Sequence, residues 1–457
     1  MSKISGKYCA GVVCALLCLP PFVLGQSIPV SSPAPTNSAA SARPASAVLH
    51  ITLQDAIERA KKLSPVLATA LTNAKVAAEA TVRARAANLP NVNGTSQYLY
   101  TEGNGTPYSR FIANNGVHEY IAQADVHQAI SAPLLIQYRR SAVLQAVAKD
   151  QATIAARGLV VTVVQAYATL FGAEGKLKTS EDTLRAARRF LTITQKRQKN
   201  GDAAHADVLK ARIQADDTQS ALTNAQLARD QARIALALLI FPNVTQSFVL
   251  ADDPSQVLTL PPHDQAEQEA ATSNPQLDAA RKARKAAGKN LTAARLGYLP
   301  TLSFDYYYGI DANRFATEGF SPEGKRIQNL GYAAMATLNM PLFTWGSIHS
   351  QVKDASSQKD LAQVNLDYAR QQAKGDFELF YQEARSAERD LKTRQEAYSD
   401  ALESRRLTLL QYQAGVATAL EVVTAESTVD TESTALYDAK TRYATAIANL
   451  ATLTGVL

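Results

Sequence analysis

Two similar stretches, SPVLATALTNAKVAAEATVRARAANLP (residues 64–90) and NPQLDAARKARKAAGKNLTAARLGYLP (residues 274–300), decide the fold of this chain. Each opens with a small polar residue followed by proline and closes with Leu-Pro. Further identities recur at the same offset of 210 residues, among them Ala60 with Ala270, Leu67 with Leu277, Arg85 with Arg295 and Tyr98 with Tyr308. Matches that keep their order and spacing indicate an internal duplication.

The duplication divides the chain into two copies of one unit. We predict a first repeat over residues 48–241, a Pro-bearing connector over 242–263 and a second repeat over 264–457. Each copy is expected to run helix, strand, strand, helix, helix. The fold class is therefore mainly α with a small β part.

Periodicity and turn residues give the expected element bounds. In the first copy we expect a helical segment over 52–89, with Thr52 as an N-cap and Pro65 in the first turn of its longer helix. Further helices are expected over 134–199 and 203–241, and strands over 92–100 and 120–130. In the second copy we expect helices over 275–299, 342–413 and 416–453, and strands over 301–310 and 330–340. The long helix of the first copy carries heptad spacing, which favours close helix pairing; its seam residues are Ala173, Leu177, Ser180, Leu184, Ala187, Leu191 and Thr194.

The first residues are typical of a targeting segment. Lys3 and Lys7 precede an apolar run, so we predict a signal peptide over 1–25 and a Pro/Ser/Ala-rich linker over 26–47. All three cysteines lie in the predicted leader. Cys18 is a poor lipid-anchor site because a bulky Leu17 precedes it. Charges are nearly balanced along the rest, which gives no sign of nucleic-acid binding.

The strands alternate between apolar and polar side chains. In residues 301–310, Leu302, Phe304, Tyr306 and Tyr308 share one face. Such alternation fits a transmembrane barrel strand and equally an ordinary half-buried sheet. Four strands cannot close a barrel, and an open edge in lipid leaves backbone groups unpaired. A membrane role therefore requires several copies to share one wall, and three copies would supply twelve strands.

The ordered motifs resemble those of the TolC-type outer-membrane efflux protein family, over residues 51–457. The motifs are the helix starts and helix-to-strand junctions quoted above, Pro133-Leu134-Leu135 and Pro341-Leu342-Phe343, and the glycine turns with Asp207-Val208-Leu209 and Glu421-Val422-Val423. The resemblance implies a homotrimer with a twelve-stranded transmembrane β-barrel continuous with a long periplasmic α-helical barrel.

The resemblance also implies a role and a place. Such a trimer is the exit duct of a tripartite efflux pump or type I secretion system. It sits in the outer membrane of a Gram-negative bacterium, in contact with outer-membrane lipid and with most of its mass in the periplasm. Its implied partners are a periplasmic adaptor protein and an inner-membrane transporter that delivers the cargo.

The family's helical turns form the periplasmic tip where the adaptor docks. The residues that match this tip are Gly201, Asp202 and Ala203 in the first copy and Gly415, Val416 and Ala417 in the second. The second turn keeps the family's small apolar pattern, whereas the first, with Asp202 and His205, matches it less well.

The family's gate combines acidic residues past the second turn with a tyrosine, an acid and an arginine. Glu421 matches the first acidic position, and Thr424 departs from the second. Tyr412 and Asp207 match the tyrosine and its acidic partner, which implies a hydrogen bond between them. Ala417 stands where the family has arginine, which puts an arginine latch in doubt. Three Glu421 carboxylates around one axis would favour cations.

Other function classes find less support. No phosphate loop, nucleophile elbow or metal-ligand spacing occurs, so we expect no enzyme, cofactor or metal site. A periplasmic or surface coiled-coil scaffold without a pore would explain the heptads but not the four alternating strands. Trp345, the single tryptophan, fits either a membrane-interface residue or a packed core residue. The sequence does not identify the cargo.

Overall fold

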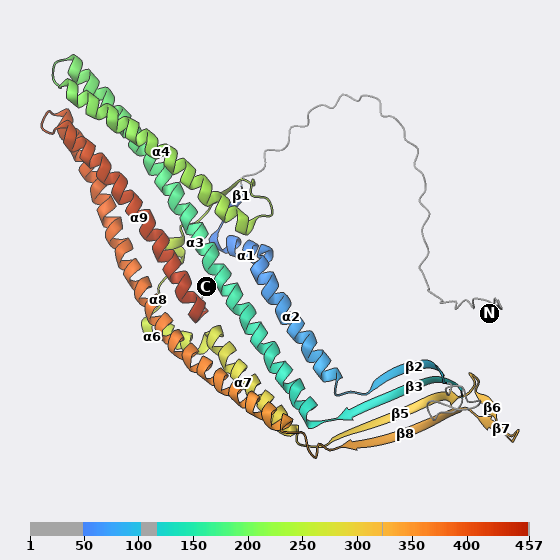
Figure 1. The fold of residues 1–457 in the computed structure, drawn as a ribbon. Coiled ribbons are helices and arrows are strands. Elements are labelled where there is room, and N and C mark those ends of the chain that lie inside the picture. Colours follow the sequence, from blue (N-terminus) through green and yellow to red (C-terminus); the bar gives the residue numbers. More distant parts are fainter. Residues whose placement is uncertain (1–48, 102–116, 322, 456–457) are drawn as a thin grey trace, which may run out of the picture. The chain divides into compact units, whose positions relative to one another are not determined.

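The computed structural model describes residues 49–101, 117–321 and 323–455, so the predicted signal peptide and linker lie outside the described residues. Its elements follow the predicted order in both copies (Figure 1). In the first copy they are α1 (Leu53–Leu63), α2 (Pro65–Ala86), β2 (Asn91–Tyr100), β3 (His118–Ile130), α3 (Ala132–Lys199) and α4 (His205–Ile240). In the second copy they are α6 (His263–Ser273), α7 (Pro275–Leu296), β5 (Thr301–Ala312), β8 (Leu330–Asn339), α8 (Ser347–Gln413) and α9 (Ala419–Thr454).

The helix starts are fixed by small polar capping residues. Thr52 caps α1 in a reciprocal capping box with Asp55, and Ser64 caps α2, whose first residue is Pro65. In the second copy, Asn274 Oδ1 accepts from the backbone N–H of Gln276 at 2.9 Å and caps α7. Helices α2 and α7 therefore start in the same way, with a capping residue followed by proline.

Three predicted helix boundaries differ from the observed ones. The helices α2 and α7 end at Ala86 and Leu296, three residues earlier than expected, because proline disfavours helical backbone in the residue before it. The helix α8 begins at Ser347 and not at residue 342. Trp345 and Gly346, with φ of 51° and 80°, adopt left-handed backbone that a right-handed helix excludes.

Five small elements were not predicted. The short strands β1 (Leu49–Ile51) and β4 (Phe248–Leu250) pair in parallel, and α5 (Pro254–Val257) follows in the connector. A short hairpin, β6 (Glu318–Phe320) with β7 (Arg326–Gln328), extends the second copy between β5 and β8. Three-residue strands give too little alternation for a sequence pattern to reveal them.

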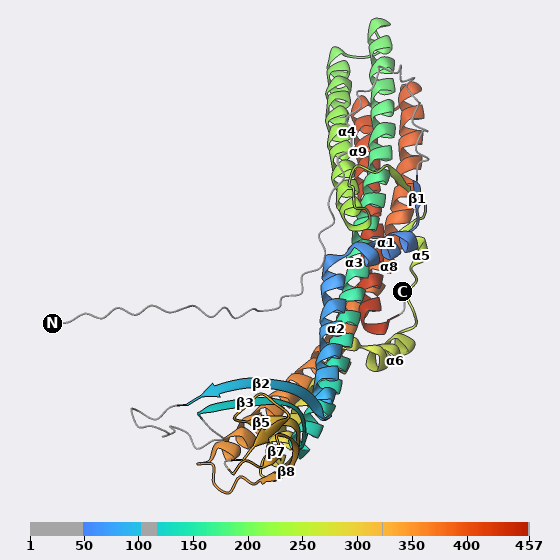
Figure 2. The ribbon, with the colours of Figure 1, turned by 90° about the vertical axis from the view of Figure 1, so that its right-hand side faces the viewer.

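The long helices form two antiparallel pairs, α3 with α4 and α8 with α9, which lie side by side (Figures 1 and 2). At about 1.5 Å per residue, α3 is about 100 Å long. The two helical turns lie at one end of the bundle, and the four-stranded sheet lies at the other (Figure 1). Of the seven predicted seam residues of α3, Ser180, Leu184, Ala187 and Thr194 are buried and the other three are half-buried.

The largest core cluster gathers where the connector meets the long helices. Among the described residues, α3 alone is long and apolar enough to span a membrane by length and composition. Within it Val163, Val164 and Tyr167 are fully buried in this cluster, and Tyr167 Oη donates to the carbonyl of Ile51 at 3.1 Å. Lys440 and Asp253 pair at 2.6 Å and join α9 to the connector. These contacts pack this stretch of α3 against the connector and the neighbouring helices.

Candidate functional site

The four-stranded sheet has two chemically different faces. Its strand order is β2-β3-β5-β8, with every neighbouring pair antiparallel. Residues paired across antiparallel strands point to the same face. The register therefore carries the alternation of β5 across the whole sheet, and the same face holds Val92, Tyr98, Tyr120, Val126, Leu302, Phe304, Tyr306, Tyr308, Tyr332 and Leu338.

The opposite face is mostly polar and is tied by cross-strand bonds. Asn93 Nδ2 donates to Asp125 Oδ2 at 3.1 Å, and His127 Nδ1 lies 2.5 Å from Asp305 Oδ1. The apolar face is the more exposed one along β5, where Phe304, Tyr306 and Tyr308 are each exposed. A soluble domain would cover such a face with its own helices, and this chain leaves it open.

The segment between β8 and α8 adds exposed apolar side chains at the end of the sheet. Phe343 and Trp345 pack edge to face with ring centroids 4.8 Å apart, and Trp345 is 90% exposed. Trp345 is therefore not a packed core residue of this chain. Its exposure beside the apolar sheet face fits the membrane-interface alternative.

The two helical turns share one backbone design. After α3, the N–H groups of Gly201 and Asp202 donate to the carbonyls of Gln198 and Arg197, at 3.0 and 2.9 Å. After α8, the N–H groups of Gly415 and Val416 donate in the same way to Tyr412 and Gln411. Both glycines have positive φ, 85° and 80°, so each turn is a Schellman motif with glycine at its left-handed position.

The turns expose the residues predicted to dock a partner. Asp202 is exposed and Ala203 half-buried in the first turn, while Val416 is 78% exposed and Ala417 half-buried in the second. Residues of both turns line one hollow of about 410 Å³, which includes Asp202, Ala203, Asp207, Tyr412 and Ala417. The structure thus brings the two predicted sets together, although they lie more than 200 residues apart in sequence.

Tyr412 is buried beneath this hollow and bonds differently from the prediction. It is 3% exposed, and its hydroxyl lies 3.1 Å from Thr194 Oγ1. Asp207 lies 4.0 Å from Lys210 of its own helix. Within one chain, the hydrogen bond expected between Tyr412 and Asp207 is replaced by one between Tyr412 and Thr194.

An arginine does contact Tyr412, but it comes from another element than the family pattern implies. Arg197 Nη1 donates to the Tyr412 carbonyl at 2.7 Å, and its guanidinium carbon lies 4.9 Å from the centre of the Tyr412 ring. Sequence reasoning missed Arg197 because a basic residue in the last turn of a helix is common. Nothing in its local pattern points to a tyrosine 215 residues away.

Glu421 lies in the first turn of α9 and has a structural partner. Its carboxylate accepts from the Thr418 backbone N–H at 2.6 Å, and Thr418 Oγ1 accepts from the Glu421 N–H at 3.3 Å. This is a reciprocal capping box, and the Thr-Ala-Leu-Glu sequence that encodes it is a recognisable signature. Glu421 is exposed beyond this contact, as is Thr424, whose hydroxyl donates to the Leu420 carbonyl.

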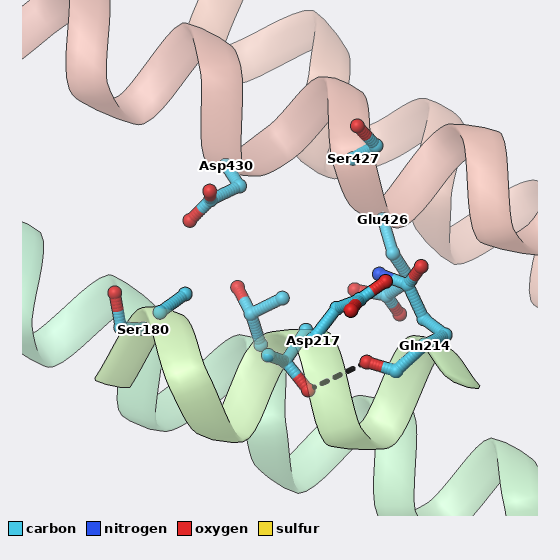
Figure 3. Close-up of a pocket in the computed structure, with 9 residues that line it drawn as sticks. Ser180, Gln214, Asp217, Glu426, Ser427 and Asp430 are labelled. Carbon is cyan, nitrogen blue, oxygen red and sulfur yellow. Dashed lines mark hydrogen bonds between the residues drawn. The ribbon is translucent and has the colours of Figure 1, made fainter. Parts of the chain in front are cut away.

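A polar pocket of about 220 Å³ lies further along the helices, between α3, α4 and α9 (Figure 3). Glu426 and Asp430 reach it from α9, and Asp217 reaches it from α4. Glu426 is 2% exposed and lies 3.5 Å from Arg405 of α8. Burial raises the pKa of Glu426, and Arg405 opposes that rise. Among the described residues, no group of acidic, histidine or cysteine side chains has the arrangement of a metal site.

Comparison with known proteins gives one consistent result. The family model described as outer membrane efflux protein matches residues 56–240 and 266–456. The chain is 25% identical to the outer membrane protein TolC of Vibrio cholerae over 433 residues, covering 92% of this chain and 94% of the relative.

Two solved structures illustrate the shared fold. The CmeC outer membrane channel of Campylobacter jejuni superposes with a TM-score of 0.73 at 16% identity, covering 88% of this chain and 85% of that one. The open state of the Neisseria gonorrhoeae MtrE outer membrane channel gives 0.72 at 19% identity, covering 88% of each chain. At these identities the likeness concerns the fold alone.

Proposed function

The chain belongs to the outer membrane efflux protein family and is an exit duct for efflux in the outer membrane, and from that premise we propose how copies of it build the duct. Three copies close side by side into one channel. Their strands form a twelve-stranded barrel in the membrane, and their helices form a tunnel in the periplasm. Each copy supplies a third of the wall, and the channel conducts passively the cargo that a pump delivers.

The observation that carries the proposal is that every layer of the chain has the same two open edges. The sheet runs β2-β3-β5-β8, the helices nearest it run α2-α3-α7-α8, and those nearest the turns run α4-α3-α9-α8. One edge always comes from the first copy, and the other comes from β8 or α8. Repeating such a head-to-tail contact generates a ring when the rotation closes.

The edge helices carry exposed apolar stripes that need covering. On α4, the exposed residues Ile213, Leu227 and Ile234 lie at heptad spacing. On α8, Leu361, Val364 and Tyr368 are each at least 60% exposed and lie on one face. On α2, Val66, Val76 and Val82 are exposed as well. A neighbouring copy would bury α8 of one chain against α2 and α4 of the next.

The ring gives each sheet face its environment. The apolar face with Phe304, Tyr306 and Tyr308 would meet lipid, and the polar face with Asp125, His127 and Asp305 would line a wet lumen. Closing the ring pairs β8 with the next copy's β2, so no strand edge remains in the membrane. The scaffold alternative gives the exposed apolar face no role.

The proposed ring predicts that charge on the α4 stripe prevents assembly. Leu227→Lys with Ile234→Lys places two ammonium groups in the apolar contact between copies. We expect detergent-extracted protein to change from trimer to monomer by native mass spectrometry, with helical circular dichroism retained. Gln226→Lys, one position off the stripe and exposed, is the matched control and should remain trimeric. A doubly substituted protein that stays trimeric would exclude this interface.

The tip residues complete the proposal. Gly201, Asp202 and Ala203 with Gly415, Val416 and Ala417 would receive a periplasmic adaptor, which connects the duct to an inner-membrane transporter. Asp207, Tyr412 and Glu421 would surround the narrow end. A ring of Glu421 carboxylates favours cations over anions.

The test of the Glu421 ring must spare the capping box. Glutamine also completes a capping box, so Glu421→Gln removes the charge and keeps the cap. We expect the reversal potential of trimers in planar bilayers under a KCl gradient to shift toward that of chloride. An unchanged reversal potential would show that Glu421 acts only as a cap.

A further inference from the structure

Arg197 bridges the two helical turns of the chain. From the last turn of α3, its Nη1 donates to the carbonyl of Tyr412 in α8 at 2.7 Å, and its Nη2 lies 3.4 Å from the carbonyl of Asp202 in its own turn. The guanidinium also covers the Tyr412 ring, 4.9 Å from its centre. One side chain therefore contacts both turns.

A cation is favourable at the end of α8. The last carbonyls of a helix lack partners within it and carry partial negative charge. The last turn of α8 contains no basic residue, whereas that of α3 contains Lys196, Arg197 and Lys199. Arg197 thus supplies to α8 the positive charge that the sequence of α8 omits. Its planar group stacks and donates at once, which a lysine cannot reproduce.

Tyr412 is a firm anchor for this contact. Its hydroxyl pairs with Thr194, and its ring meets Phe190 edge to face at 5.1 Å. The surrounding buried cluster adds residues of α4 and α9, so that all four long helices meet beneath the guanidinium; these residues are Ala211, Ala419 and Val422.

We propose that Arg197 is a positioning residue that fastens the two turns of one chain together and thereby sets the resting width of the channel's narrow end. The inference rests on the proposed function, because the turns border a pore only in the assembled ring. Residue 417, where the family has an arginine, is alanine in this chain, and Arg197 supplies the arginine from α3 instead. While Arg197 donates its hydrogen bond to the Tyr412 carbonyl, the two turns of a chain move as one body. When this hydrogen bond breaks, the two turns separate.

The test measures conductance of native trimers and of Arg197→Ala, Arg197→Lys and Arg189→Ala trimers in planar bilayers. Arg189 is an exposed arginine two turns earlier on α3 and is the matched control. We expect Arg197→Ala to raise the ratio of high- to low-conductance occupancy about tenfold, which corresponds to about 1.4 kcal/mol. Arg197→Lys should fall between, because lysine keeps the charge but loses the stacking. Arg189→Ala should match the native trimer.

A distance measurement keeps the inference testable where conductance is altered by assembly. Spin labels on Lys199→Cys and Gln413→Cys, both exposed, report the separation of the turns when labelled chains are diluted into unlabelled ones. The separation should broaden in Arg197→Ala and stay narrow in Arg189→Ala. If Arg197→Ala trimers show native conductance and the native separation of the turns, the proposed role of Arg197 is wrong, whereas the proposed duct function stands. Native protein that carries no current would instead overturn the proposed function and, with it, this inference.

Discussion

The two helical pairs of this chain have nearly the same length and the same topology but are held together differently. Across α8 and α9, Arg394 pairs with Glu432, Arg405 with Glu426, and Arg442 with Glu383. No ion pair crosses between α3 and α4 among the residues that the structure describes. The turns differ too: Thr418 and Glu421 cap α9, whereas α4 begins after Ala204 with no side-chain cap bond.

This difference shows that the two copies share one backbone arrangement but stabilise it with different ion pairs and helix caps. Exposed ion pairs add little individually, so the capping box carries most of the contrast. The second pair fixes its own turn. The first pair is joined to the second through Arg197 and through the pair of Lys176 with Asp438.

The largest expected effect comes from filling the second turn. Gly415→Trp forces a side chain into a φ of 80°, which costs about 1–2 kcal/mol, and its first carbon would already lie 3.9 Å from Arg197. Under the proposed function, bulk at this point would also block adaptor docking. We expect export in a channel-deficient strain to fall to background while trimers still assemble.

Gly201→Trp is the comparison that sharpens this result. It carries the same backbone strain, but a side chain there begins in open space. We expect partial export, measured as drug resistance of the same strain. Equal loss at both glycines would mean that backbone strain alone, and not the neighbourhood of Arg197, decides the phenotype.

Removing the cap of α9 should make the stability of the second turn more similar to that of the first. Thr418→Ala deletes the hydroxyl that accepts from the Glu421 N–H, and loss of such a cap costs about 1 kcal/mol. Thermal denaturation of the trimer should therefore occur at lower temperature. Thr424→Ala, at an exposed threonine six residues further on, should leave it unchanged. An equal effect would show that loss of the cap is not the cause.

The buried carboxylate of the second pair predicts a pH dependence. Because burial raises the pKa of Glu426, the folded state binds its proton more tightly than the unfolded chain. Its charged form thus lowers stability at neutral pH, and the penalty fades as pH falls through the raised pKa. Glu426→Gln should stabilise the trimer by about 1 kcal/mol at pH 7.5 and not at pH 4. A pH-independent change in thermal stability would contradict this.

The smallest effect should come from giving the first pair what it lacks. Ala204→Ser supplies an N-cap hydroxyl to α4, and caps of this kind contribute about 0.5–1 kcal/mol. We expect a slight rise in the denaturation temperature of the trimer, which would make the stability of the first turn more similar to that of the second. Ala206→Ser, inside the helix, is the control and should bring no rise. An equal gain from both substitutions would show that an added surface hydroxyl, and not the cap, raises the denaturation temperature.

The sequence predicted the architecture well because the repeat is written in residues with strong local meaning. Ser64-Pro65 and Asn274-Pro275 start helices, and Gly201 and Gly415 end them. Alternation in β5 predicted one apolar face, and the register extended it across four strands. These features depend on neighbours a few residues away.

Other features depend on distant contacts and could not be predicted. Arg197 meets Tyr412 only because two hairpins pack side by side, and the Thr194 hydroxyl takes the bond assigned to Asp207. The left-handed backbone at Trp345 likewise delays α8 without a glycine at that residue to announce it. The capping box of Thr418 with Glu421 could also have been predicted from the sequence, in which Glu421 was interpreted only as a charge at the pore.

The exposed edges of β2 and β8 also bear on how the protein matures. A lone sheet with two ten-residue edges is a template for mispairing, whereas the helices carry their hydrogen bonds within themselves. We therefore expect the bundle to fold first in the periplasm and the strands to be shielded until three chains meet. On that view the hazard in biogenesis is aggregation of stranded monomers, and quality control should act before insertion.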